Sequence, residues 1–434
     1  MIKKLIRNFL MGIRLRKVYN LASYYKFKFG LYRRVLECKR NYAKVLNRIR
    51  NREIGQKVKV LFLNNEISKW KCQTVYEAML DSKIFEPVVG ITALGERSLL
   101  SDEALEAHLI SNERYFDKLG VSHIRVISLF PRRYHDLKDY NPDIVFFPEP
   151  GFKIWPQTTE YISNFALTCY VPYYIALLVQ SSKYCLEEMH RFLYLYFAQS
   201  KVLTKAYSKI LGIFNHSYKF YISGHPSLDR YVIDKNVCPC ASKRMVIYAP
   251  HWTVHGGGTG IRFSTFLETG EFILEYARLH PEVIWVFKPH PNLRKRLTDV
   301  SDWSEEKIDS YYTAWNNIGI SYFGSEYQDI FLNSECLITD SASFLMEYAA
   351  TGHPIVHLLS SEWTYDNFPY TRNLLETYYS VRTIEELQKA LELVVERRSD
   401  PNKSIRINAV KEQGLVAENA GVRITNYLAK LVQG

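Results

Sequence analysis

The chain has 434 residues, of which 47% are hydrophobic and 23% charged; this balance excludes a disordered or fibrous protein and leaves room for two ordinary domains. Its net charge is +11, but residues 1–53 contain 16 Lys or Arg and only two Glu, so the remaining residues together are close to neutral. The charge therefore belongs to one basic segment and not to the body of the protein.

This N-terminal segment has the pattern of a basic amphipathic helix. Apolar residues recur at helical spacing over residues 1–22 among Lys and Arg, and residues 31–53 continue as a basic helix. We predict that residues 1–53 are helical and contact an anionic membrane surface, as a peripheral attachment at the cytoplasmic face. A helix packed on the body, or one that binds nucleic acid, is the alternative; we expect no nucleic-acid partner. Frequent charges argue against a signal peptide, and no segment predicts a transmembrane helix.

Seven cysteines are scattered through the chain, and the Cys-Pro-Cys at 238–240 is too closely spaced for a zinc ribbon. We expect free thiols in a reducing cytoplasm, without a disulfide framework or a structural metal. The sequence also lacks a His-Glu-x-x-His motif and a Gly-x-Ser-x-Gly nucleophile elbow.

Strands and helices alternate from residue 57 onward, which predicts a doubly wound parallel sheet. The first array comprises the expected strands 58–65, 85–92, 123–129 and 143–150, with helices at 74–82 and 102–118. The pattern then restarts with a strand, a turn and the start of a helix over 220–231. Strands at 244–252 and 283–291 follow, with a helix at 271–282 between them, then a strand–helix–strand unit at 336–358 and helices at 383–398 and 416–432. We predict two Rossmann-like domains that face a cleft, over residues 54–215 (acceptor) and 216–400 (nucleotide donor), with residues 401–434 packing back on the body.

Polar residues follow three strands of the second array, where ligands of parallel sheets bind. His251 follows the first strand, His290 the second, and Asp340, Ser341 and Ser343 the third. A helix that begins near Ser341 would point its N–H groups at a phosphate, with both serine hydroxyls beside them. The alternative is that Asp340 or Ser341 only caps the helix.

The side chain of His290 lies between two prolines in Lys-Pro-His-Pro, with Lys288 two residues before it. It can hydrogen-bond a diphosphate or protonate a leaving phosphate. The alternative is a surface histidine whose hydrogen bonds are made with neighbouring groups of the protein or with water. The glycine-rich run 256–260 is a weak phosphate-loop candidate. In the first half, Glu149 at a strand end is a candidate base or an exposed loop carboxylate.

Together, Y-A-P-H-W (248–252), F-K-P-H-P (287–291) and I-T-D-S-A-S-F-L-M-E-Y (338–348) resemble motifs of the CDP-glycerol glycerophosphotransferase family, and G-H-P-S-L-D (224–229) resembles the segment that opens its second domain. The resemblance covers residues 215–360 well. It implies a GT-B fold, a CDP-linked donor as substrate with no cofactor and no metal, and a polysaccharide or lipid-linked acceptor.

In the family, residues matching His290 and segment 339–343 contact the donor diphosphate, so the resemblance implies donor contact by His290, Asp340, Ser341 and Ser343. We expect Lys288 to bind the donor as well. The family's first-domain Trp-His-Gly motif, whose histidine is proposed as the base, is replaced by Y-V-P-Y-Y (170–174). His251 or Glu149 would then take the role of base.

The resemblance predicts transfer of glycerol phosphate, or a similar alditol phosphate, from a CDP-activated donor to a hydroxyl of a cell-surface polymer or lipid-linked acceptor in teichoic-acid-like or capsule biosynthesis. Two alternatives remain open at this point: an inverting GT-B glycosyltransferase that uses a nucleotide sugar for capsule or lipopolysaccharide synthesis, and a non-catalytic scaffold.

Overall fold

The computed structural model describes residues 29–94, 98–147, 149, 154–175, 188–211, 219–231, 244–255, 262–324, 327–363, 370–416 and 419–434. The expected helix over 1–22 and the glycine-rich run 256–260 lie outside these described residues. Of the seven cysteines, Cys38, Cys72, Cys169 and Cys336 are described, and all four are free and buried.

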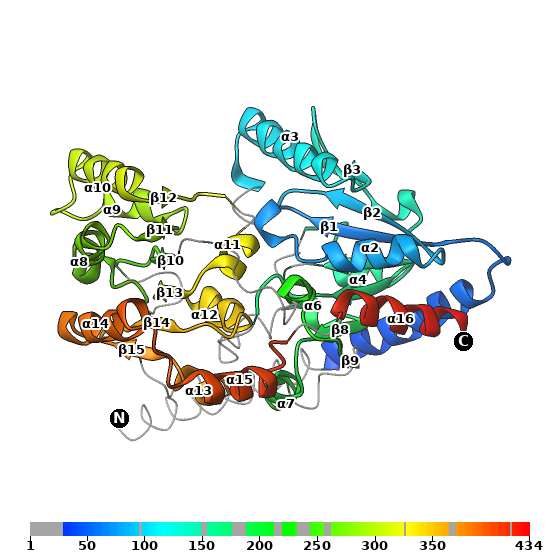
Figure 1. The fold of residues 1–434 in the computed structure, drawn as a ribbon. Coiled ribbons are helices and arrows are strands. Elements are labelled where there is room, and N and C mark those ends of the chain that lie inside the picture. The colour runs from blue at the N-terminus through cyan, green and yellow to red at the C-terminus, as the bar shows by residue number, and fades with distance from the viewer. Residues whose placement is uncertain are drawn as a thin grey trace, which may run out of the picture.

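The first half of the chain forms a parallel sheet with helices packed around it (Figure 1). Its strands, in the order β3-β2-β1-β6-β7-β8-β9, are β1 (Val58–Asn64), β2 (Phe85–Ile91), β3 (His123–Arg125), β6 (Ile144–Phe147), β7 (Leu167–Tyr170), β8 (Leu195–Ala198) and β9 (Lys219–Ile222). Its helices are η1 (Ile67–Lys69), α2 (Gln73–Asp81), α3 (Asp102–Lys118), η3 (Leu137–Tyr140), α4 (Thr159–Ile162), α6 (Glu188–Arg191) and α7 (Lys201–Leu211). A small antiparallel pair, β4 (Ile127–Leu129) and β5 (Arg132–Tyr134), stands apart from this sheet.

The second half forms another parallel sheet, in the order β12-β11-β10-β13-β14-β15. Its strands are β10 (Arg244–Ala249), β11 (Val283–Phe287), β12 (Ile320–Ser321), β13 (Cys336–Thr339), β14 (Ile355–Leu358) and β15 (Tyr379–Val381). Its helices are η5 (Pro226–Tyr231), which leads into it, α8 (Phe266–Leu279), α9 (Leu293–Leu297), α10 (Glu305–Ile318), α11 (Gln328–Asn333), α12 (Ala342–Ala349), α13 (Arg372–Leu375), α14 (Ile384–Leu391) with its π-helical continuation η7 (Glu392–Glu396), and α15 (Lys403–Glu412). Chain order reverses beside β1 and beside β10, the switch points where doubly wound sheets bind ligands.

Two segments differ from the sequence prediction. Residues 219–222, expected to open the second array, form the edge strand β9 of the first sheet, since they pair with β8. The sequence of a short strand does not indicate which sheet it joins, so periodicity alone could not place the boundary between the two sheets. The expected strand 123–129 divides at Val126, because β3 pairs with β2 while residues 127–129 turn away to pair with β5.

A helix over residues 29–50 packs on the first sheet. One face of it is buried in the core; the residues of that face are Leu31, Val35, Cys38, Tyr42, Val45 and Ile49. Their spacing of three and four residues is that of one helical stripe. The buried carboxylate of Asp143 forms ion pairs with Arg48, in the last turn of this helix, and with Arg52, just after it. The basic segment is thus partly integral to the body.

The last helix, α16 (Ala420–Gln433), returns from the second half of the chain to the first and packs on α2 (Figure 1). Asp229 in η5 joins these parts, because its carboxylate accepts hydrogen bonds from the N–H groups of Ala420 (2.6 Å) and Gly421 (2.8 Å) and from the hydroxyl of Thr74 (2.7 Å). Within the described residues, no helix is both long and apolar enough to span a bilayer.

Candidate active site

A cleft of about 590 Å³ lies between the two sheets, at the carboxyl ends of their strands. This volume is within the range of pockets that hold small organic ligands, roughly 300–1,000 Å³. Both halves of the chain line it. Its polar lining includes Glu66, Lys69, Lys71, Glu149, Tyr173, Tyr174, Lys288, His290, Asn292, Tyr327, Ser341, Ser343 and Glu347.

The imidazole of His290 is oriented so that one ring nitrogen can donate into the cleft. Its backbone N–H donates to the carbonyl of Pro250 (3.0 Å), and its Nδ1 accepts from the N–H of Asn292 (3.1 Å). The proton of a neutral ring therefore belongs on Nε2. Burial, with nearby Lys288, lowers the pKa of His290 to about 4. At neutral pH the ring is an uncharged hydrogen-bond donor in the cleft.

The ring of His251 lies behind His290 and does not line the cleft in the described part of the chain. The two ring centroids are 5.4 Å apart, and the His251 ring also packs on Phe263. Its Nδ1 lies 2.9 Å from the hydroxyl of Thr253. Burial, and then the neighbouring His290, lowers the pKa of His251 to about 3. This position suits support of His290 better than contact with an acceptor.

The carboxylate of Asp340 holds two backbone N–H groups of the second domain in place. It is buried and accepts from the N–H of His251 (2.5 Å) and from the N–H of Thr265 (2.7 Å). Burial raises the pKa of Asp340 to about 6 despite these hydrogen bonds. Asp340 therefore ties the ends of β10 and β13 together, and the structure does not bring it to the cleft as the sequence led us to expect.

The start of α12 faces the cleft as predicted. Ser341 is its N-cap residue, with extended backbone, yet its side chain makes no capping hydrogen bond to the described residues of the helix. Its hydroxyl lies 3.5 Å from that of Ser343, and both residues line the cleft. The hydroxyls and the first N–H groups of α12 are thus a set of hydrogen-bond donors suited to an anion.

The side chain of Lys288 is almost fully buried under three aromatic rings of Tyr322, Tyr327 and Phe344, with its Nζ 4.9 Å from the centroid of Tyr327. Its ammonium donates to the carbonyl of Gly324 (3.1 Å). Burial lowers the pKa of Lys288 to about 8, although the carboxylate of Glu347 opposes the shift.

Several residues of the cleft were not predicted from the sequence, among them two charged residues close to Tyr327. The carboxylate of Glu347 accepts from the hydroxyls of Tyr231 (3.2 Å) and Tyr327 (2.8 Å). It lies four residues after Ser343 on the same face of α12, and that spacing was the signal that could have identified it. Lys71 was missed too: its ammonium lies over the ring of Tyr327, across the cleft from its own domain.

The carboxylate of Glu149 lines the first-domain side of the cleft. Its Oε2 pairs with the ammonium of Lys69 (2.5 Å). Its Oε1 is buried and makes no hydrogen bond within the described residues. A carboxylate that is oriented by a cation on one oxygen and has no hydrogen-bond partner on the other can accept a proton from a hydroxyl that reaches it.

Two further buried histidines, and Trp70, have structural positions. The buried His225 bridges Ser227 and the carbonyl of Pro172 (2.9 Å), and His357 is enclosed against Trp363. Trp70 packs in the first core. Across the described residues, His, Cys, Asp and Glu side chains form no cluster of three or more able to hold a metal ion.

Residues 179–411 match the sequence profile of a family described as CDP-Glycerol:Poly(glycerophosphate) glycerophosphotransferase. The match spans more than half of the chain. The protein is a member of this family.

Solved structures similar to this glycerophosphotransferase-family chain show its fold. The S. aureus MnaA–UDP co-structure is 16% identical, with a TM-score of 0.51 over 86% of this chain and 96% of that one. A Listeria monocytogenes structure, described as a putative UDP-N-acetylglucosamine 2-epimerase, is 13% identical, with a TM-score of 0.52 over 85% and 95% of the two chains. The wall teichoic acid polymerase TagF is 13% identical, with a TM-score of 0.49 over 93% and 97%. No curated protein matches significantly.

The likenesses to the first two of these structures, together with the two parallel sheets, confirm the predicted GT-B-like architecture. The family match confirms the resemblance seen in the three motifs and identifies the chain as a transferase of the glycerophosphotransferase type.

Proposed function

We propose that this transferase moves glycerol phosphate from CDP-glycerol to the terminal hydroxyl of an anionic cell-surface polymer or its lipid-linked precursor, as a peripheral protein at the cytoplasmic face of the membrane. The single observation that carries the proposal is that Lys288, His290, Ser341 and Ser343 line one cleft. These side chains supply a cation, a neutral N–H donor and two hydroxyls, which is a suitable set for a diphosphate.

In the proposed reaction, an acceptor hydroxyl attacks the phosphorus that bears glycerol. A new P–O bond forms while the bond from that phosphorus to the bridging oxygen breaks, and the electron pair leaves on CMP. The Nε2–H of His290 and the ammonium of Lys288 stabilise the charge that develops on the CMP phosphate. The serine hydroxyls and the first N–H groups of α12 hold the diphosphate in place.

We assign the proton of the attacking hydroxyl to Glu149. Its Oε1 is buried in the wall of the cleft without a hydrogen bond within the described residues, whereas the ring of His251 packs against that of His290 and does not line the cleft. Tyr173, from the segment that replaces the family's Trp-His-Gly motif, lies next to this pair: the ammonium of Lys69 is 5.4 Å from its ring centroid. We propose that the step needs neither a bound metal nor a cofactor.

The donor is tested by incubating the purified protein with CDP-glycerol, CDP-ribitol and a panel of nucleotide sugars, and measuring which nucleotide is released. Release of CMP from CDP-glycerol, undiminished by EDTA, is expected. Release of a nucleoside diphosphate from a nucleotide sugar alone would instead establish the glycosyltransferase alternative.

The role of His290 is tested by His290→Ala. Loss of one donor to a developing charge reduces kcat on the order of 10²–10³-fold. His280→Ala is a matched control, since His280 is a similarly half-buried histidine of the same domain, remote from the cleft at the end of α8. Near wild-type turnover of His290→Ala would contradict the assignment.

A further inference from the structure

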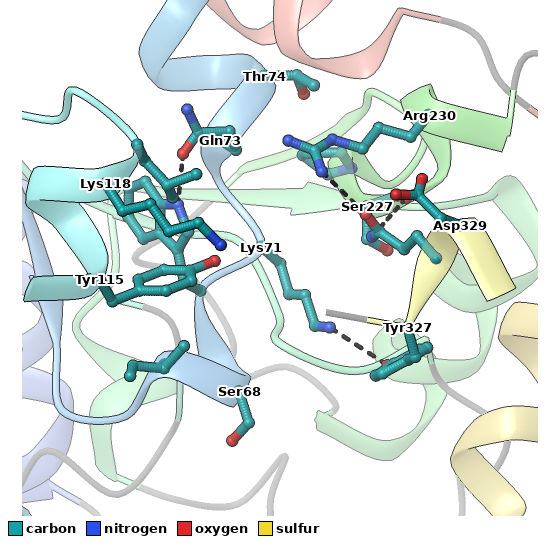
Figure 2. A pocket seen from close by; sticks show the side chains of 15 residues that line it. Ser68, Lys71, Gln73, Thr74, Tyr115, Lys118, Ser227, Arg230, Tyr327 and Asp329 are labelled. Atoms are coloured by element: carbon teal, nitrogen blue, oxygen red, sulfur yellow. Dashed lines mark hydrogen bonds between the residues drawn. The ribbon is translucent and has the colours of Figure 1, made fainter. Parts of the chain in front are cut away.

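A second pocket, of about 210 Å³, opens beside the cleft (Figure 2). Its walls come from both halves of the chain: segment 67–74 and the end of α3 on one side, and η5 and the start of α11 on the other. It is smaller than the usual pocket for an organic ligand the size of a nucleotide, roughly 300–1,000 Å³. Its size suits one small polar group.

The charge of this pocket is positive. Lys118 at the end of α3, Lys71 and Arg230 contribute cations, and Asp329 is the one carboxylate among the described lining residues. In Figure 2, Lys118 and Arg230 stand on opposite walls with Lys71 between them. The guanidinium of Arg230 is 3.5 Å from the amide oxygen of Gln328, a contact with a neutral group. Such a set of cations favours an anion.

The pocket adjoins the cleft. Ser68, Lys71 and Tyr327 line both. The ammonium of Lys71 lies 3.4 Å from the hydroxyl of Tyr327, which in turn donates to Glu347 in the cleft. A group bound in the pocket is therefore separated from the donor site by only the side chains of Lys71 and Tyr327.

We propose that this second pocket binds a phosphate of the acceptor chain, so that the acceptor's terminal hydroxyl extends past Lys71 into the cleft. This proposal rests on the proposed function, because the acceptor there is a polymer of alditol phosphates, and each unit of such a polymer carries a negative charge. It gives the enzyme a preference for acceptors that already contain phosphate over neutral polyols. The CDP-linked donor is left to the larger cleft.

The test uses the full chain with the substitutions Lys118→Gln and Arg230→Gln combined, and a synthetic trimer of glycerol phosphate as the acceptor. Two exposed cation–anion contacts together are worth on the order of a tenfold change in affinity. We expect KM for the trimer to rise about tenfold or more, KM for the donor to change less than twofold, and the salt dependence of trimer binding to weaken. Arg114→Gln is the control, because it removes an exposed cation of α3 that does not line the pocket.

Direct titration of the trimer in the presence of CDP separates this proposal from the proposed function. If the chain does not use CDP-glycerol, turnover fails, but the trimer still binds to wild type and binds about tenfold or more weakly to the double variant. If turnover with CDP-glycerol is normal and the double variant keeps the wild-type KM for the trimer, the pocket assignment is overturned. The pocket assignment is also overturned if the double variant binds the trimer as wild type does and loses binding only to phosphatidylglycerol vesicles or to inorganic phosphate.

Discussion

At the scale of single residues, the cleft contains basic groups whose protonated, charged form is disfavoured by burial. His290 is neutral at physiological pH, and Lys288 keeps its proton less firmly than an exposed lysine, since burial lowers both pKa values. Each becomes a stronger partner when an anion arrives, because a nearby negative charge favours the protonated form. The site is therefore prepared for a diphosphate.

We expect the ammonium of Lys288 to make the proposed reaction sensitive to alkaline pH. Its pKa is lowered from 10.5 to about 8, so the ammonium is present below that pH and lost as the pH rises through it. Of the charged and titratable groups around it, Glu347 favours the ammonium and Lys71 opposes it, while Tyr327 titrates well above pH 10. We expect kcat/KM for the donor to fall about tenfold per pH unit above pH 8.

A pH profile from about 6 to 10 measures this fall, and Lys288→Arg is the comparison. An arginine stays charged throughout this range, so the decline near pH 8 should disappear even if the larger side chain lowers the absolute rate. An unchanged decline in Lys288→Arg would exclude Lys288 as its source.

At the scale of elements, local sequence signals and the structure agree best where a helix is long and capped. The expected helix 102–118 coincides with α3, whose N-cap Ser101 accepts from the N–H of Ala104. The strand–helix–strand unit at 336–358 forms β13, α12 and β14 in that order. Elements not predicted from the sequence, such as β7 and β8, are short buried strands, and an apolar run of four residues has no distinctive period.

Helix α16 depends on one glycine for its close packing on α2. A Cβ on Gly421 would lie 2.4 Å from the backbone carbonyl of Thr74, which is too close for the two helices to keep their positions. Gly421→Ala is therefore expected to destabilise the protein by about 1–3 kcal/mol, as overpacking does. The midpoint of urea unfolding, followed by circular dichroism, measures the change.

The control for this substitution is Val422→Ala on the exposed side of the same helix, where a surface change is worth within about 0.5 kcal/mol. Equal stability of Gly421→Ala and wild type would mean that α16 does not need this contact distance.

At the scale of the whole molecule, the helix over 29–50 has its apolar face against the body and its basic face outward. Arg33, Arg40 and Lys44 are exposed and recur on one side of the helix, opposite the buried stripe. Membrane contact by this part of the chain would therefore be electrostatic and not by insertion of apolar side chains. Deletion of residues 1–53 would remove core residues along with the charges, so truncation there is a poor test.

Charge removal without truncation is the sharper experiment. Arg33→Gln, Arg40→Gln and Lys44→Gln together should lower affinity for vesicles rich in phosphatidylglycerol by about 1 kcal/mol per residue at low salt. Sedimentation with vesicles measures it; Lys389→Gln with Lys411→Gln, on exposed faces of the second half, is the control. Wild-type binding by the triple variant would remove the helix from the membrane contact.

The sequence by itself determined the class of fold, the three strand ends that carry His251, His290 and the serines, and the family, because burial periodicity and short motifs are local properties of the chain. It could not assign β9 to a sheet, and it treated Asp340 and His251 as equals of His290.

Only the tertiary structure decided which of these groups reach the cleft. Asp340 braces the N–H groups of His251 and Thr265, Glu347 faces Lys288, and Lys71 crosses to Tyr327 from the other domain. The last of these contacts joins residues more than two hundred positions apart. The packing of two sheets against one another brings such residues together, and no local pattern records it.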